Sequence, residues 1–188
     1  MTDDERLEDR LRYILGFVEG HVKFAETKNA ALLVVNTTAV AGAIQLLSSA
    51  TGPNLWFARY LDIFAFFNAL SGVIALLSFL PITSLSWFVK RGKSADSDSL
   101  LFFGDSQKYD VRSYLKGLYS ASGIEVGSFS PLHRMYAEQI INNSRIAWRK
   151  FSYFRAGTWA TIAGVLTPVA AAILFYIVNT YDSLLESS

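Results

Sequence analysis

Three long stretches without a charged residue constrain this chain more than any other feature. They run from Asn29 to Ala58, from Ile63 to Val89 and from Ala156 to Tyr181. A helix needs about 20 mostly apolar residues to cross the hydrocarbon core of a bilayer. Backbone groups inside lipid must be hydrogen-bonded within their own segment, which favours helices. With 188 residues, the chain is too short to bury three such helices in a soluble core. The sequence therefore predicts an all-α membrane protein with three transmembrane helices.

The distribution of basic residues predicts the orientation. Five Lys and Arg precede the first stretch, eleven lie between the second and third, only Arg59 lies in the short connection, and none follows the third. The positive-inside rule then places the N-terminus and the central loop in the cytoplasm. The expected segments are an N-terminal cytoplasmic helix (1–28), a first transmembrane helix (29–50), an external turn (51–62), a second transmembrane helix (63–82), a central cytoplasmic region (83–155), a third transmembrane helix (156–178) and an external tail (179–188).

Amphipathic segments precede the first and third transmembrane stretches. Between Leu7 and Val22, apolar residues recur every three or four positions, which is typical of one buried helical face. Ser130 followed by Pro131 is a strong helix start, and no Gly or Pro interrupts the sequence from Leu132 to Ala156. We therefore expect both segments to continue unbroken into the membrane. The inward face of the second should contain Leu132, Met135, Tyr136, Ile140, Asn143, Ala147, Phe151 and Phe154, and the opposite face His133, Glu138, Asn142, Arg145 and Arg149.

The rest of the central loop is expected to complete a small, mainly helical cytoplasmic domain. Residues 90–99 read as a polar linker, and the LLFFG run after them as a strand or a buried extended segment. Asp105 or Ser106 can cap a helix from about Gln107 to Tyr119. Its inward residues should be Tyr114, Leu115 and Leu118.

Nothing in the sequence indicates catalysis. The chain has no cysteine, and His21 and His133 are isolated from other metal-ligating residues. Nucleophile-elbow, phosphate-loop and zinc-protease motifs are absent. A formal net charge of +1 gives no basic excess for nucleic acid. We therefore expect no enzyme, no cofactor, no metal site and no nucleic-acid partner.

Polar and small residues occur within the apolar stretches. Such residues allow helices to approach closely, and they can alternatively line a pore in an oligomer. Three spans are too few to enclose a wide pore, so action on a membrane would need a homo-oligomer. The candidates for helix packing or pore lining are Asn36, Asn68, Ser71, Gly72, Thr161 and Gly164.

Three sequence sets resemble the Pycsar effector transmembrane family (PycTM) of bacterial anti-phage systems. They are AETKNAALL at the first span, LLFFGD after the polar linker, and QIINNSRIAWRKFSYFR before the third span. The resemblance extends from about Glu19 to Phe175. It implies a multi-pass protein of the bacterial inner membrane whose soluble region binds a cyclic mononucleotide, cCMP or cUMP, made by a partner cyclase. Binding would impair the membrane and halt the infected cell, as abortive infection. The alternative is a membrane scaffold or anchor that senses no ligand and binds a protein partner.

The resemblance directs attention to residues suited to a nucleotide. Arg145 and Arg149 are four apart on one helix face, so both can reach one phosphate group, and Asn142 shares that face. The other interpretation is a basic stripe that faces solvent or anionic lipid. Phe102, Phe103 and Tyr109 have rings suited to stacking on a pyrimidine, or to the core of a small helical domain.

Overall fold

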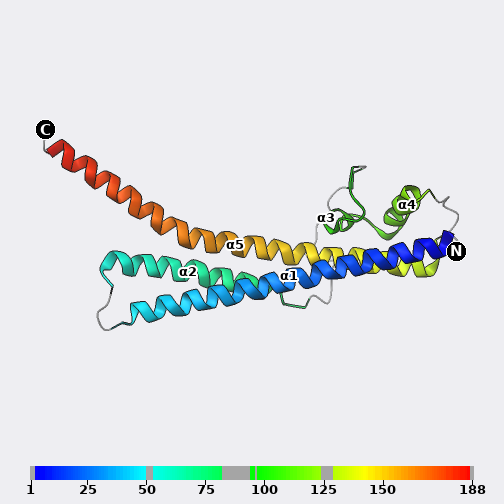
Figure 1. Cartoon of the computed structure of the whole chain (residues 1–188), viewed down its shortest axis with the longest axis horizontal. Helices are drawn as coiled ribbons and strands as arrows, with labels where there is room; N and C mark the ends of the chain where they lie inside the picture. The colour runs from blue at the N-terminus through cyan, green and yellow to red at the C-terminus, as the bar shows by residue number, and fades with distance from the viewer. Residues whose placement is uncertain (1–2, 50–52, 82–93, 96, 124–128, 187–188) are drawn as a thin grey trace. The chain divides into compact units, whose positions relative to one another are not determined.

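A computed structural model of the chain describes residues 3–49, 53–81, 94–95, 97–123 and 129–186, and every regular element in them is helical (Figure 1). The helices are α1 (Asp3–Leu47), α2 (Leu55–Leu77), α3 (Phe103–Ser106), α4 (Val111–Ala121) and α5 (Pro131–Glu186). Three of them, α1, α2 and α5, are long and apolar enough to cross a membrane. The prediction of an all-α membrane protein with three transmembrane helices is confirmed.

The polypeptide divides into two compact units. The head unit combines Met1–Thr27 with Leu80–Ser152, and the membrane unit combines Lys28–Phe79 with Tyr153–Ser188. Both α1 and α5 contribute residues to each unit. Each is one uninterrupted helix, as the sequence predicts.

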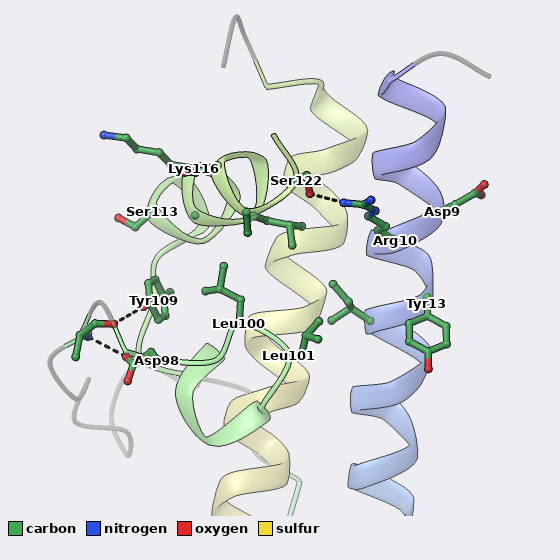
Figure 2. A pocket seen from close by; sticks show the side chains of 16 residues that line it. Asp9, Arg10, Tyr13, Asp98, Leu100, Leu101, Tyr109, Ser113, Lys116 and Ser122 are labelled. Atoms are coloured by element: carbon green, nitrogen blue, oxygen red, sulfur yellow. Dashed lines mark hydrogen bonds between the residues drawn. The ribbon is translucent and has the colours of Figure 1, made fainter. Parts of the chain in front are cut away.

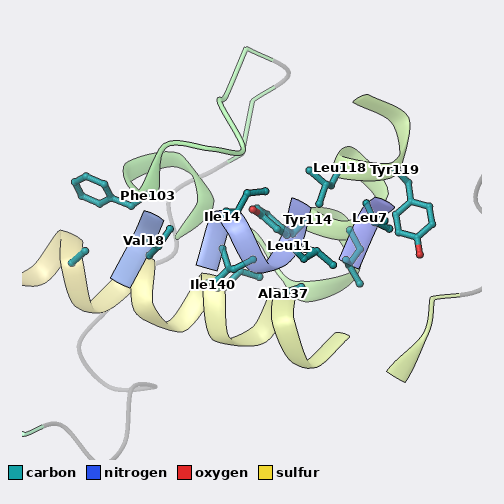
Figure 3. Packing of buried hydrophobic residues seen from close by; sticks show 13 residues of the cluster. Leu7, Leu11, Ile14, Val18, Phe103, Tyr114, Leu118, Tyr119, Ala137 and Ile140 are labelled. Atoms are coloured by element: carbon teal, nitrogen blue, oxygen red, sulfur yellow. The ribbon is translucent and has the colours of Figure 1, made fainter. Parts of the chain in front are cut away.

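The head unit has its own hydrophobic core, in which α1, α4 and α5 meet (Figure 3). The predicted face of α1 is correct, because Leu7, Leu11, Ile14 and Val18 are all buried. The inward residues of α4 are also correct, with Tyr114 and Leu115 completely buried. The other core members are Phe103, Leu118, Tyr119, Ala137, Ile140, Ile141 and Ala147.

The predicted inward face of α5 is partly wrong. Leu132 and Met135 are 41% and 64% exposed, whereas His133, expected on the opposite face, is only 2% exposed. The His133 imidazole can be buried because its Nδ1 lies 2.9 Å from the Tyr119 hydroxyl, which satisfies both polar groups. The buried face also contains small residues such as Ala137, so the positions of the large apolar residues alone do not identify this face.

Helix boundaries in the head unit differ from the sequence-based ones. Phe103–Ser106 forms the short helix α3 rather than an extended segment. The next helix begins at Val111, because the Asp110 side chain accepts hydrogen bonds from the N–H groups of Arg112 (2.9 Å) and Ser113 (3.0 Å). Residues 90–93 and 96 of the expected linker lie outside the described residues.

Two membrane-unit helices differ from their predicted bounds, and α2 extends from Leu55 to Leu77 rather than over 63–82. The Asn54 side chain caps the Phe57 N–H at 2.9 Å, so α2 begins at Leu55 and occupies part of the segment 51–62 expected as a turn. The last helix, α5, continues to Glu186, through most of the expected tail 179–188.

Candidate ligand-binding cavity

A cavity of the head unit lies between α1, α4 and the segment that precedes α4 (Figure 2). It has a volume of about 1090 Å³ and is hereafter the α1–α4 cavity. Ligand pockets usually measure about 300–1,000 Å³, so a small organic molecule fits. The lining residues are Asp9, Arg10, Tyr13, Ile14, Ala95, Asp98, Leu100, Leu101, Tyr109, Ser113, Lys116, Gly117, Leu118, Ser120, Ala121 and Ser122.

A cluster of charged side chains holds the wall formed by residues 97–109. Lys108 Nζ donates to Asp98 Oδ1 (2.9 Å) and to Asp105 Oδ1 (2.7 Å). Asp98 also accepts a hydrogen bond from the Ala95 N–H at 2.9 Å. That bond and Lys108 lower the pKa of the Asp98 carboxyl, so it is ionised at neutral pH. The salt bridges raise the pKa of Lys108.

Contacts around Leu100 fix this wall to α4. The Leu100 carbonyl accepts hydrogen bonds from Tyr114 Oη (3.0 Å) and Ser106 Oγ (2.8 Å). A Cβ atom at Gly117 would lie only 3.0 Å from Leu100 Cδ1. Gly117 therefore lets the Leu100 side chain lie directly against α4, and the cavity floor is apolar.

Two cations line the cavity, one on each flanking helix. Arg10 of α1 donates to Ser122 Oγ at 2.7 Å, and Figure 2 shows it directed across the cavity, while Asp9 points to the other side of α1. Lys116 of α4 is the second cation. The lining contains the acids Asp9 and Asp98 and the bases Arg10 and Lys116, and Asp98 shares Lys108 with Asp105. Arg10 and Lys116 are suited to pair with an anionic group, and the apolar floor is suited to an apolar or aromatic portion of the same molecule.

The sequence-predicted residues Arg145, Asn142 and Tyr109 meet at a separate, smaller cavity of about 200 Å³. Arg145 donates to the backbone carbonyls of Gln107 and Tyr109, both at 3.3 Å. The carboxylates of Asp110 and Glu138 also line this cavity. The Asp110 pKa is lowered by its capping bonds with Ser113, so its negative charge persists there at neutral pH.

The remaining predicted residues do not line either cavity. Arg149 Nη2 donates to the Leu80 carbonyl at 3.3 Å, so the two guanidinium groups are directed to different partners. Phe103 is buried and stacks on Phe151, with ring centroids 5.3 Å apart. Phe102 is 47% exposed and lies against Phe103.

Sequence reasoning missed Arg10 and Lys116. They are 106 positions apart, so no local spacing pattern connects them. Only the tertiary arrangement of α1 and α4 brings them to one cavity. In the sequence, both look like ordinary charges on the solvent side of an amphipathic helix.

In the membrane unit, Asn36, Ser71 and Thr161 form one buried hydrogen-bond network that joins α1, α2 and α5. Asn36 Nδ2 donates to Ser71 Oγ (2.8 Å), Ser71 Oγ donates to the Gly157 carbonyl (2.7 Å), and Thr161 Oγ1 donates to Asn36 Oδ1 (2.9 Å). The second Asn36 amide hydrogen bonds the Leu32 carbonyl at 2.8 Å. Every donor of these three side chains therefore has a partner, and all of these bonds except the one to Leu32 join different helices.

The other predicted membrane residues lie at the same helix contacts. Asn68 and Gly72 are buried on α2. Gly164 brings α5 very close to α2, because a Cβ there would lie 2.8 Å from Phe67 Cβ. Within this unit, these positions lie where the helices pack against one another.

Comparison with known families identifies the chain. Its residues 10–178 match the Pycsar effector protein domain, PycTM. The chain belongs to this family. Pycsar effectors of this family are transmembrane anti-phage proteins, and the family is not a known enzyme family. Neither the curated proteins nor the solved structures gave a match.

The match to the Pycsar effector domain includes residues of both units. It contains Arg10 at its first position, the whole of α4, and most of α5. The family resemblance predicted from the sequence is confirmed.

Among the described residues, no group of three or more His, Cys, Asp or Glu side chains is placed to hold a metal ion.

Proposed function

We propose that this Pycsar effector is a ligand-gated membrane protein. Its head unit binds a cyclic pyrimidine mononucleotide, cCMP or cUMP, in the cytoplasm, and its membrane unit then impairs the bacterial inner membrane as a homo-oligomer. The observation that carries the proposal is the family match over 10–178, which includes all residues that line the α1–α4 cavity except Asp9 and most of each apolar helix.

The α1–α4 cavity is the proposed nucleotide site. Its volume of about 1090 Å³ accommodates a mononucleotide. The single phosphodiester charge pairs with Arg10 and Lys116, and the ring of Tyr13 or Tyr109 is available for stacking on the base. Hydroxyl groups on α4, such as Ser113, can hydrogen-bond the ribose or the base edge.

The smaller cavity at Arg145 supports nucleotide binding less well. At about 200 Å³ it is smaller than usual ligand pockets. A phosphate there would face Asp110 and Glu138, and Arg145 would have to leave its two backbone carbonyls. We therefore assign Arg145 the role of fixing the 107–109 backbone, and the experiment below tests both sites.

Coupling to the membrane follows from chain connectivity. Arg10 lies on α1, which continues to Leu47 as the first apolar span. Shifting a two-state protein from mostly closed to mostly open needs about 5.5 kcal/mol of differential binding. Two charge-assisted hydrogen bonds of about 1.5–3 kcal/mol each, made only in the open state, supply most of this.

The test is nucleotide-dependent leakage of dye from liposomes that contain the full-length protein. Leakage should rise with cCMP or cUMP and not with cAMP. Arg10→Gln with Lys116→Gln should shift the half-maximal concentration at least tenfold. Arg12→Gln, a change on the same helix at a residue paired with Glu8 (2.8 Å), should not.

Two outcomes would overturn these assignments. If Arg145→Gln shifts the response and the Arg10/Lys116 variant does not, the nucleotide binds at the smaller cavity. If neither nucleotide changes leakage for correctly folded protein, the gating proposal fails. A scaffold that binds a protein partner would then be the better description.

A further inference from the structure

An apolar groove lies within the membrane unit, between the first turns of α2 and the part of α5 that follows Pro168. Its volume is about 630 Å³. Aromatic and aliphatic side chains such as Phe57, Tyr60 and Ile63 form one side, and the small residues Ala171 and Ala172 form part of the other. The groove therefore lies on the surface that is expected to face lipid.

The local sequence of α5 explains why this groove forms. At Gly164 the two helices are in very close contact, as the 2.8 Å approach to Phe67 Cβ indicates. Four residues later, Pro168 removes one helical hydrogen bond and favours a bend. Beyond it, α5 curves away from α2 (Figure 1). The close contact at Gly164 and the bend at Pro168 together determine where α2 and α5 separate.

One cation lines this groove. Arg59 is the only Lys or Arg between Lys28 and Lys90. It is exposed, and among the described residues it has no hydrogen-bond or ion-pair partner. It lies on the first turns of α2 beside Trp56, a residue type enriched at the membrane–water interface. An apolar groove with an unpaired cation at the interface suits a ligand with an acyl chain and a phosphate.

We infer that this groove binds one anionic glycerophospholipid, with an acyl chain against Ala171 and Ala172 and the phosphate on Arg59. A helix of a second copy fits less well. A helix is about 10 Å across with a rise of 1.5 Å per residue, so 630 Å³ seats only about five of its residues. The apolar spans of a second copy also offer no anion to Arg59. This lipid site is independent of nucleotide sensing by the head unit.

Native mass spectrometry of the full-length protein, titrated with a phosphatidylglycerol in detergent, tests the site. Arg59→Gln should weaken binding of the first phosphatidylglycerol about tenfold or more, because it removes the phosphate partner. Arg155→Gln removes another exposed cation of the same unit and is the matched control. It should leave the affinity unchanged.

Ala172→Leu fills the groove with a residue that transmembrane helices accept readily, so the variant should insert and fold. It should abolish tight binding of phosphatidylglycerol. Equal losses in Arg59→Gln and Arg155→Gln would indicate nonspecific charge attraction and overturn the inference. Wild-type lipid binding in Ala172→Leu would also overturn it. A changed oligomeric state in Ala172→Leu, with lipid binding intact, would assign the groove to a second copy instead.

Discussion

Replacing Gly164 with alanine should loosen the membrane unit. The new Cβ would lie 2.8 Å from Phe67 Cβ, an atom fixed to the α2 backbone that cannot rotate away. To reach an ordinary contact of 3.4 Å, α2 and α5 must separate by about 0.6 Å. Overpacking of this kind costs about 1–3 kcal/mol, whereas alanine gains at most about 1 kcal/mol over glycine in a helix. We expect the free energy of unfolding to fall by up to about 3 kcal/mol.

The assay is reversible unfolding of the protein in bicelles, compared across three matched Gly→Ala variants. A Cβ at Gly72 would meet its nearest neighbour, Leu33 Cδ1, at 3.8 Å, and a Cβ at Gly42 would meet nothing within 4 Å. Both of these variants should be as stable as the wild type or slightly more stable. If the Gly164→Ala variant were as stable as the Gly42→Ala variant, α2 and α5 would not be in close contact at Gly164.

Three further changes test other parts of the structure. Thr161→Val should cost about 0.6–1.7 kcal/mol of unfolding free energy, because Asn36 Oδ1 loses its donor, and Thr161→Ser should restore most of it; unfolding in bicelles measures both. Asp110→Ala should cost about 1 kcal/mol by removing the α4 cap, with faster amide exchange in α4, and Asp110→Asn should cost less. The pKa of Asp98 is lowered in the folded protein, so its stabilising effect is present above the unfolded value near 4 and is lost as the pH falls through the lower folded value. In the wild type, the amides of residues 97–109 should therefore be less protected from exchange below about pH 4, after correction for the intrinsic pH dependence of exchange. In Asp98→Asn, their protection should not change over the same pH range.

Strong local signals predicted much of the fold correctly. Long uncharged runs identified the three apolar helices, and Ser130 before Pro131 marked the start of α5. The spacing of Leu7, Leu11 and other α1 residues identified a buried face, because that helix contributes large side chains to the core. In each case one physical preference dominates the local sequence.

Competing or long-range interactions explain the errors. Asp105, Ser106 and Asp110 are all suitable capping residues within six positions, and the sequence does not show which one is used. The α5 face was misjudged because His133 is buried by its bond to Tyr119, a partner 14 residues away. The α1–α4 cavity depends on two helices that lie far apart in the sequence, which no spacing rule can connect.

Calorimetric titration of the full-length protein with cCMP and with cUMP tests most directly whether the head unit senses a cyclic nucleotide. We predict saturable one-site binding of at least one of them to the wild type. Arg10→Gln should weaken that binding tenfold or more, since Arg10 is the α1 cation of the α1–α4 cavity. Folded protein that releases no binding heat with either nucleotide, at concentrations up to the millimolar range and at two temperatures, would contradict the proposed sensing function.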